Sequence, residues 1–339
     1  MYIHYNDKIH NKQLAKMWKR KLNFLSGYIL DPISRVNKLL PGWKKHTIEI
    51  LYNKQREIDN LFEKCKSIEF SKEEQIFGRN ILKKFGLKDE DKFVCFAIRD
   101  GAYQLKKISA RYRDWSYQDF RNYDIDRFLL AAEELTKRGY YVFRMGVVAE
   151  KPFKSKNPKI IDYANSSLRS DFMDIYLGAN CSFCVATNYG FDALPNIFGR
   201  PIVMLGQPLG DLRTNNENFL LMTKHHIYKK EKRRLTLSEI FSFGLAFAYD
   251  SKIFQDKGVD LVDNTPQEIK DLAVEMAEYV ESNKKLNNSD EELQKTFKEL
   301  YSYNLKRFNL NKRESYALHG AIKSRFSTKF LRENRDWLN

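Results

Sequence analysis

Short apolar runs alternate with helical patterns through the middle of the chain. The runs predict strands at residues 93–98, 140–145, 159–163, 183–186 and 202–205, and the segments 126–138 and 171–177 between them predict helices. Strands that are apolar along their whole length are typical of parallel sheets covered on both faces. The pattern therefore predicts an α/β protein with a doubly wound, Rossmann-type parallel sheet.

The segment 183–204 carries the most local information. Its first strand is followed by a turn at residues 187–190, and apolar side chains then recur at helical spacing: Phe191, Leu194, Ile197 and Phe198. Gly199 is expected to end this helix, and Pro201 precedes the next strand. Because free amides and the helix dipole favour anions, the turn predicts a phosphate-binding helix N-terminus capped by Thr187 or Asn188.

The outer segments predict mostly helices. Ser71 with Glu74, and Thr265 with Glu268, form capping-box patterns, and residues 289–301 and the basic tail 307–339 are expected to be helical. Residues 13–25 form a basic amphipathic helix with its apolar side chains on one face: Leu14, Met17, Trp18, Leu22 and Leu25. That face either packs against the core or lies on an anionic membrane surface.

Composition limits the partners. The 339 residues carry a net charge of +15 and are 42% hydrophobic, so the chain is globular and either favours anionic partners or has a solvated basic surface. No run of 18 apolar residues or apolar signal core is present. Cys181 and Cys184 have metal-ligand spacing without a second pair, so neither a metal site nor a disulfide framework is expected.

Polar residues follow two predicted strands at the edge where open α/β sheets bind ligands. Arg99 and Asp100 follow the first strand, and Arg144 lies at the end of the second. A guanidinium group grips phosphate through its fork of donors, so both arginines are candidates for a diphosphate. Asp100 is a candidate base or an orienting partner of Arg99, and a plain surface Arg–Asp pair is the alternative.

The loop 111–124 is dense in arginine, aspartate and aromatic side chains. Such a loop suits a sugar or a nucleobase, with aromatic faces for stacking and charged groups for hydroxyls or phosphate. It is also compatible with single-stranded nucleic acid or with a decorated surface loop. The chain lacks a P-loop, a G-x-G-x-x-G turn, a G-x-S-x-G elbow and a zinc motif, which disfavours kinases, dehydrogenases and serine hydrolases.

Several of these segments together resemble a family of bacterial glycosyltransferases associated with surface-polysaccharide gene clusters. The likeness is carried by residues 93–103, 121–125, 139–146, 161–164, 169–180, 190–192, 235–240 and 330–334, and so covers nearly the whole chain. It implies the two-Rossmann GT-B fold and metal-independent transfer from a sugar nucleotide held mainly by the C-terminal domain.

The chain departs from the family pattern in three places. Ala97 stands where members usually carry the His of a His-x-Arg-Asp motif, which resembles that of fucosyltransferases. The turn 186–190 contains Tyr189 where members are rich in Ser, Thr and Gly. Residues 11–20 resemble a segment that longer members carry well inside their chain, so the N-terminal domain is expected to be shortened.

The resulting hypothesis divides the chain into a basic, mostly helical region 1–90, a nucleotide-sugar-binding domain 91–285 and a helical tail 286–339. It predicts a glycosyltransferase, cytoplasmic or peripheral at the inner face of the membrane, that acts on a glycan or lipid-linked glycan acceptor without cofactor or metal and binds no nucleic acid. The alternatives are a catalytically impaired nucleotide-sugar or glycan-binding protein and a basic nucleic-acid-binding protein.

The hypothesis assigns each candidate residue a role. Asp100 is the first candidate for a base and Asp124 the second, and Arg99 is expected to offset leaving-group charge. The expected donor contacts are Arg99, Tyr103, Arg144, Met145, Gly146, Thr187, Asn188, Tyr189, Gly190 and Asp192. The expected acceptor or donor contacts are Tyr112, Arg113, Arg121 and Asn122.

Overall fold

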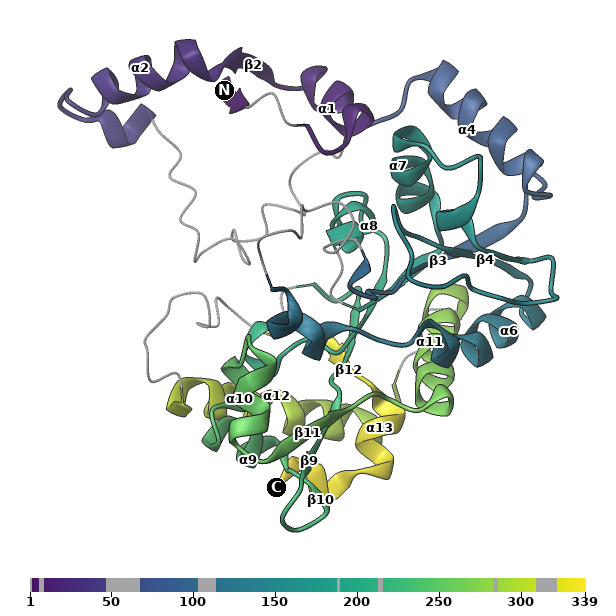
Figure 1. The fold of residues 1–339 in the computed structure, drawn as a ribbon, viewed down its shortest axis with the longest axis vertical. Helices are drawn as coiled ribbons and strands as arrows, with labels where there is room; N and C mark the ends of the chain where they lie inside the picture. Colours follow the sequence, from purple (N-terminus) through teal and green to yellow (C-terminus); the bar gives the residue numbers. More distant parts are fainter. Residues whose placement is uncertain are drawn as a thin grey trace.

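The computed structural model describes residues 2–5, 9–46, 68–102, 114–187, 190–212, 216–282, 286–308 and 322–339. Within these ranges no helix is both long and apolar enough to cross a membrane. Figure 1 shows a sheet with helices on both sides, and the N-terminal elements extend from one end of it.

A seven-stranded sheet forms the centre of the fold, and all of its strands are parallel. In spatial order its strands are β12 (Arg325–Phe326), β8 (Phe219–Met222), β7 (Ile202–Leu205), β6 (Phe183–Ala186), β3 (Lys92–Ala97), β4 (Tyr140–Arg144) and β5 (Ile160–Ile161). The chain runs outward from β3 to β5 and then returns to place β6 on the other side of β3. This reversal confirms the predicted doubly wound α/β class.

Helices cover both faces of the sheet. Figure 1 shows α4 (Lys72–Lys84) and α7 (Asp171–Asn180) on one side of β3 and β4, and α6 (Leu129–Lys137) and α11 (Pro266–Ser282) on the other. All four residues of β6 are fully buried, as expected for a central parallel strand. The predicted capping boxes are confirmed at the start of α4 and of α11, where Thr265 and Glu268 bond to each other's backbone N–H.

A second, smaller sheet was not anticipated from the sequence. Its antiparallel order is β10 (Arg233–Arg234), β9 (His225–Tyr228) and β11 (Val259–Val262). The helices of this half of the chain are α9 (Leu237–Ser242), α10 (Ser251–Asp256), α12 (Asn288–Phe308) and α13 (Thr328–Glu333). The tail is therefore not helical throughout, because β12 lies in it and pairs with β8.

The N-terminal region contains a parallel pair of strands, β1 (Tyr2–Tyr5) and β2 (Asn23–Ser26), and two helices, α1 (Lys12–Lys19) and α2 (Gly27–Asn37). Met17 is 1% exposed and forms a small core with Ile68 and Ile175, flanked by Leu14 and Trp18. The apolar face of α1 therefore packs against the body of the protein. The predicted helix 13–25 was too long, because it ends at Lys19 and the chain continues into β2.

The remaining short helices are of the 3₁₀ type. They are η1 (Trp43–His46), η3 (Ser116–Arg121), η4 (Ile125–Phe128), η5 (Tyr163–Asn165), η6 (Gly190–Asp192), η7 (Leu209–Asp211), η8 (Leu245–Phe247) and η10 (Arg335–Leu338). The division into regions 1–90, 91–285 and 286–339 stays a prediction.

The short helix predicted after β6 is present and consists of two pieces. The turn leads first into η6, and the α-helical part, α8 (Ala193–Ile197), has five residues. Asp192 precedes α8 without a side-chain capping bond. The Thr187 hydroxyl accepts a hydrogen bond from the Arg99 N–H. The predicted phosphate-binding role of this turn stays a prediction, because Asn188 and Tyr189 lie outside the described residues.

Close approach of α4 and α7 generates a stability prediction. A Cβ atom at Gly78 would collide with the ring of Tyr176, whereas one at Gly190 would meet no atom within 4 Å. We expect Gly78→Ala to lower the free energy of unfolding by about 1–3 kcal/mol through overpacking, despite alanine's better helix propensity. Urea denaturation of both variants tests this, with Gly190→Ala as the control, and an unchanged midpoint for Gly78→Ala would contradict it.

Candidate functional site

The strand order reverses between the neighbouring strands β3 and β6, and Arg99 lies two residues beyond the end of β3. Arg99 is 5% exposed. Its backbone N–H donates to Thr187 Oγ1 at 2.8 Å, and its carbonyl oxygen accepts from the Tyr123 N–H at 2.9 Å. Since Thr187 follows β6 and Tyr123 follows η3, these two bonds fix three segments to one another at the reversal point.

Near this point a shared hydrogen-bond acceptor, Gln118, holds two arginine side chains together. Arg99 donates from Nε to Asn122 Oδ1 at 3.0 Å and from Nη2 to Gln118 Oε1 at 3.1 Å. Arg121 donates from Nη1 to the same Gln118 oxygen at 3.3 Å. We call Arg99 and Arg121 the arginine pair. Two guanidinium groups that share one neutral acceptor are well placed to bind an anion between them.

Asp192 adds a negative charge beside the arginine pair. It is 2% exposed, and its charge raises the pKa of Arg121 while burial, the larger effect, lowers it. Arg121 nevertheless stays protonated, as guanidinium groups do in proteins. The structure thus places five of the predicted site residues around one point: Arg99, Arg121, Asn122, Thr187 and Asp192.

Arg144 lies elsewhere, in a buried cluster. It is 1% exposed, and its guanidinium faces Asp100 at 3.1 Å and Asp162 at 3.6 Å. Arg144 is still within β4, in register with Phe96, so its side chain lies below the sheet edge. At this position Arg144 faces two carboxylates, and its expected diphosphate contact stays a prediction.

The carboxylate of Asp100 is also engaged. Its Oδ2 accepts from Arg144 and from the Glu150 N–H at 2.8 Å, and its Oδ1 accepts from the Ala102 N–H at 3.1 Å. These bonds hold the loop 146–150 against the end of β3. Both oxygens therefore take part in positioning this loop.

Met145 and Gly146 continue this buried edge. Met145 is 1% exposed, and its N–H extends the ladder to the Phe96 carbonyl oxygen at 2.8 Å. Gly146 approaches Ala164 closely, since a Cβ there would lie 3.4 Å from the alanine Cβ. Neither residue is brought to the arginine pair by any contact described here.

Asp124, the second candidate base, caps a helix. Its carboxylate accepts from the Asp126 N–H at the start of η4 and pairs with Lys151 Nζ at 2.5 Å. The hydrogen bond from Lys151 lowers the pKa of Asp124 below its usual range. A lowered pKa makes a carboxylate a weaker base, so the geometry does not favour this role.

Five predicted site residues lie outside the described residues: Tyr103, Tyr112, Arg113, Asn188 and Tyr189. Gly190 begins η6 and is exposed. The predicted roles of these six residues stay predictions.

The structure adds Lys224, which sequence reasoning missed. It follows β8, is 6% exposed, and donates from Nζ to the Asn122 carbonyl oxygen at 2.6 Å. The ammonium also pairs with Asp263 at 2.7 Å and lies 4.2 Å from the ring centroid of Tyr123. The rule that identified Arg99, a polar residue directly after an apolar run, applies equally to Lys224 after residues 219–222.

Within the described ranges, no group of three or more His, Cys, Asp or Glu side chains could hold a metal ion. Cys95, Cys181 and Cys184 are buried free thiols, and burial raises the pKa of Cys95 and Cys184. His225 pairs with Glu268 at 2.9 Å, and His226 Nδ1 lies 3.1 Å from the Lys224 carbonyl oxygen. These groups serve packing and local hydrogen bonding.

Comparison with known proteins gives limited matches. No family model matches the chain, and no curated protein matches it. Two solved structures are similar: the E. coli ADP-heptose LPS heptosyltransferase II and the glycosyl transferase family 9 protein from Veillonella parvula. Each is 14% identical with a TM-score of 0.36, and the matches cover 62% and 63% of this chain and 53% of each solved chain.

The chain thus spans about half the length of the solved structures that it matches. Both solved proteins are glycosyltransferases by name.

His226 generates a prediction for acid stability. Burial lowers its pKa to about 4, against about 6.5 in the unfolded chain. The unfolded state therefore binds more protons below about pH 6.5, and stability falls as the pH drops from there toward about 4, by roughly 3 kcal/mol in the limit. We expect His226→Gln to reduce this pH dependence and the exposed His10→Gln to leave it unchanged. Urea denaturation between about pH 7 and about pH 5 measures it. Equal slopes for His226→Gln and the wild type would refute it.

Proposed function

We propose that the protein is a glycosyltransferase that moves a sugar from a nucleotide-sugar donor to a glycan or lipid-linked glycan acceptor in surface-polysaccharide biosynthesis. The seven-stranded sheet is the donor-binding half of a GT-B arrangement. The observation that carries the proposal is the arginine pair, held at the reversal point of the sheet by the shared oxygen of Gln118. This edge is where open α/β sheets bind nucleotides.

The proposed chemistry needs positive charge at the leaving group. When the bond from the sugar to the nucleoside diphosphate breaks, negative charge develops on the diphosphate. Arg99 and Arg121 are oriented by Gln118 and Asn122 before the donor arrives, so little reorganisation is needed during the reaction. Side-chain cations supply this stabilisation without a metal, which fits the proposed metal-independent transfer.

A second candidate function is nucleotide-sugar binding without transfer. It is favoured by Ala97, which is fully buried in β3 at the position where the resembled family carries His. The carboxylates of Asp100 and Asp124 are already engaged. Incubation with labelled nucleotide sugars separates the two functions, because a transferase releases the nucleotide and a binding protein returns the donor intact.

The helix α2 is the proposed contact with an anionic membrane surface. Its apolar side chains Ile29, Ile33 and Val36 are 53%, 56% and 59% exposed and recur at helical spacing. Arg35 and Lys38 lie beside them and are exposed. An apolar stripe with flanking cations is typical of helices that lie in the membrane interface. In this proposal α2 takes the place of the amphipathic segment expected at residues 13–25.

Nucleotide binding tests the arginine pair. We expect UDP, GDP or CMP, or a corresponding sugar nucleotide, to raise the melting temperature of the wild type by mass action. Arg99→Ala and Arg121→Ala each remove a charge-assisted bond, so calorimetry should show about 10- to 100-fold weaker affinity. Arg79→Ala, an exposed arginine of α4, is the matched control. The proposal fails if no nucleotide binds or if Arg99→Ala binds as tightly as Arg79→Ala.

Vesicle binding tests α2. Ile33→Asp places a charge in the apolar stripe, so we expect about tenfold or greater loss of affinity for phosphatidylserine-containing vesicles. Ile76→Asp is the matched control, because Ile76 of α4 is similarly exposed at 54%. Sedimentation with vesicles of anionic or neutral lipid gives the measurement. Equal binding of the two variants would exclude α2 as the contact.

A further inference from the structure

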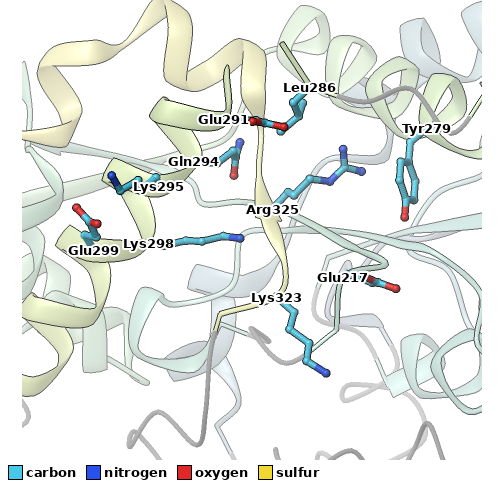
Figure 2. A pocket seen from close by; sticks show the side chains of 10 residues that line it. All are labelled: Glu217, Tyr279, Leu286, Glu291, Gln294, Lys295, Lys298, Glu299, Lys323 and Arg325. Carbon is cyan, nitrogen blue, oxygen red and sulfur yellow. The ribbon is translucent and has the colours of Figure 1, made fainter. Parts of the chain in front are cut away.

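A cavity of about 590 Å³ lies at the edge of the central sheet opposite to the arginine pair. Lys323 precedes β12, Arg325 is the first residue of β12, and Glu217 precedes β8. The cavity therefore opens at the amino ends of these parallel strands. Helices α11 and α12 supply the other walls (Figure 2). Its volume falls within the range of small-molecule binding sites.

The wall between α12 and β12 is built by one side chain. The Gln294 amide donates from Nε2 to the Phe326 carbonyl oxygen at 2.7 Å and accepts from the Phe326 N–H at 3.0 Å. It thus pairs with the open edge of a two-residue strand as a neighbouring strand would. Gln294 is 4% exposed, and this pair of hydrogen bonds fixes Arg325 relative to α12.

Arg325 is oriented toward the cavity by alternation along β12. Phe326 is fully buried in the core, so the side chain of the preceding residue leaves on the opposite face. The Arg325 guanidinium stacks on Tyr279, 4.2 Å from its ring centroid. Its Nη2 atom is buried and makes no hydrogen bond within the described part of the chain.

Lys298 is the second cation that faces the hollow. Figure 2 shows its ammonium pointing from α12 to the space beneath Arg325. Burial lowers the pKa of Lys298, and the charge of Arg325 lowers it further. Among the described residues no carboxylate lies within ion-pair distance of either cation, and the Glu275 carboxylate interacts with Arg325 only through the longer-range attraction of their charges. Two like charges held together in a half-buried cavity are costly unless an anion joins them.

The rest of the polar lining carries both signs of charge: Lys295 and Lys323 are basic, Glu217, Glu291 and Glu299 are acidic, and Gln294 is neutral. Glu217 and Glu291 line the same cavity on either side of Arg325 in Figure 2. Carboxylates accept hydrogen bonds from hydroxyl groups, and they disfavour an extended polyanion by repulsion. The lining therefore suits a molecule with one anionic group and several hydroxyls rather than a nucleic acid.

We propose that this cavity binds a small anionic sugar, with its phosphate or carboxylate group on Lys298 and Arg325 and its hydroxyls on Glu217 and Glu291. The site is separate from the arginine pair, since the two lie at opposite edges of the same sheet. It does not depend on the function proposed above, because an anionic sugar bound here contacts neither Arg99 nor Arg121.

Calorimetry with four probes tests the ligand class. We expect glucose 6-phosphate or glucuronate to bind at millimolar concentration, and glucose and inorganic phosphate to bind more weakly than the better of these two. The tighter of the two anionic sugars identifies phosphate or carboxylate as the preferred group. Absence of binding by both anionic sugars overturns the proposal, as does inorganic phosphate binding as tightly as the better one.

Lys298→Met provides the decisive variant. The change keeps the length of the side chain and removes a charge that Arg325 repels, so the variant should be at least as stable as the wild type. Its affinity for the anionic sugar should fall about 10- to 100-fold. Lys306→Met, an exposed lysine further along α12, is the control and should bind like the wild type. Unchanged affinity in Lys298→Met overturns the assignment.

A cross-check separates the two sites. Arg99→Ala should retain the anionic sugar, and Lys298→Met should retain the nucleotide. If Arg99→Ala loses the anionic sugar as well, the sugar binds at the arginine pair and the cavity is not its site.

Discussion

The carboxyl edge of the sheet depends on one constraint, the reversal of strand order between β3 and β6. The chain leaves β3 in one direction and β6 in the other, so their following segments diverge and leave the reversal point uncovered by crossovers. The backbone of Arg99 closes this point, because its N–H bonds to Thr187 and its carbonyl oxygen to Tyr123. A buried backbone group needs a partner, and here the partners come from the two diverging loops. The position of the arginine pair follows from this bonding.

The central strands could be predicted because their signal is local. Strand β6 and strand β7 have the bounds that their apolar runs indicate, since a buried parallel strand needs apolar side chains on both faces. Strand β12 could not be predicted, because a strand of two residues that begins with Arg325 is too short to show an alternation of polar and apolar side chains. It is a strand because it pairs with β8 on one edge and with the Gln294 amide on the other, and both partners are distant in sequence. The segment after β6 was predictable, because its apolar spacing indicated a short helix, which the structure forms as η6 followed by α8.

The candidate site was predictable in position but not in detail. Residues after strands were expected to face a ligand, which places Arg99 correctly at the reversal point and would have placed Lys224 as well. The same reasoning did not anticipate that Arg144 faces Asp100 and Asp162, because one residue decides whether a side chain belongs to the strand or to the loop beyond it. Arg144 is still paired in register with Phe96, and the loop that covers it is held by Asp100. The sequence alone does not indicate that this loop covers Arg144, since the contacts of the loop join residues about fifty positions apart.

The net charge of +15 becomes informative when cations are sorted by environment. Exposed pairs such as Lys252 with Asp256 contribute little and indicate no ligand. Arg325 is partly explained by the fold, because Tyr279, on which it stacks, lies in the last turn of α11, where the helix dipole favours a cation. The dipole does not explain Lys298, which lies well inside α12 and beyond the one-turn range of the effect. Burial and the nearby arginine both disfavour its charge, and no described carboxylate pairs with it. The position of Lys298 is thus one that a bound anion would account for and the helix dipole does not.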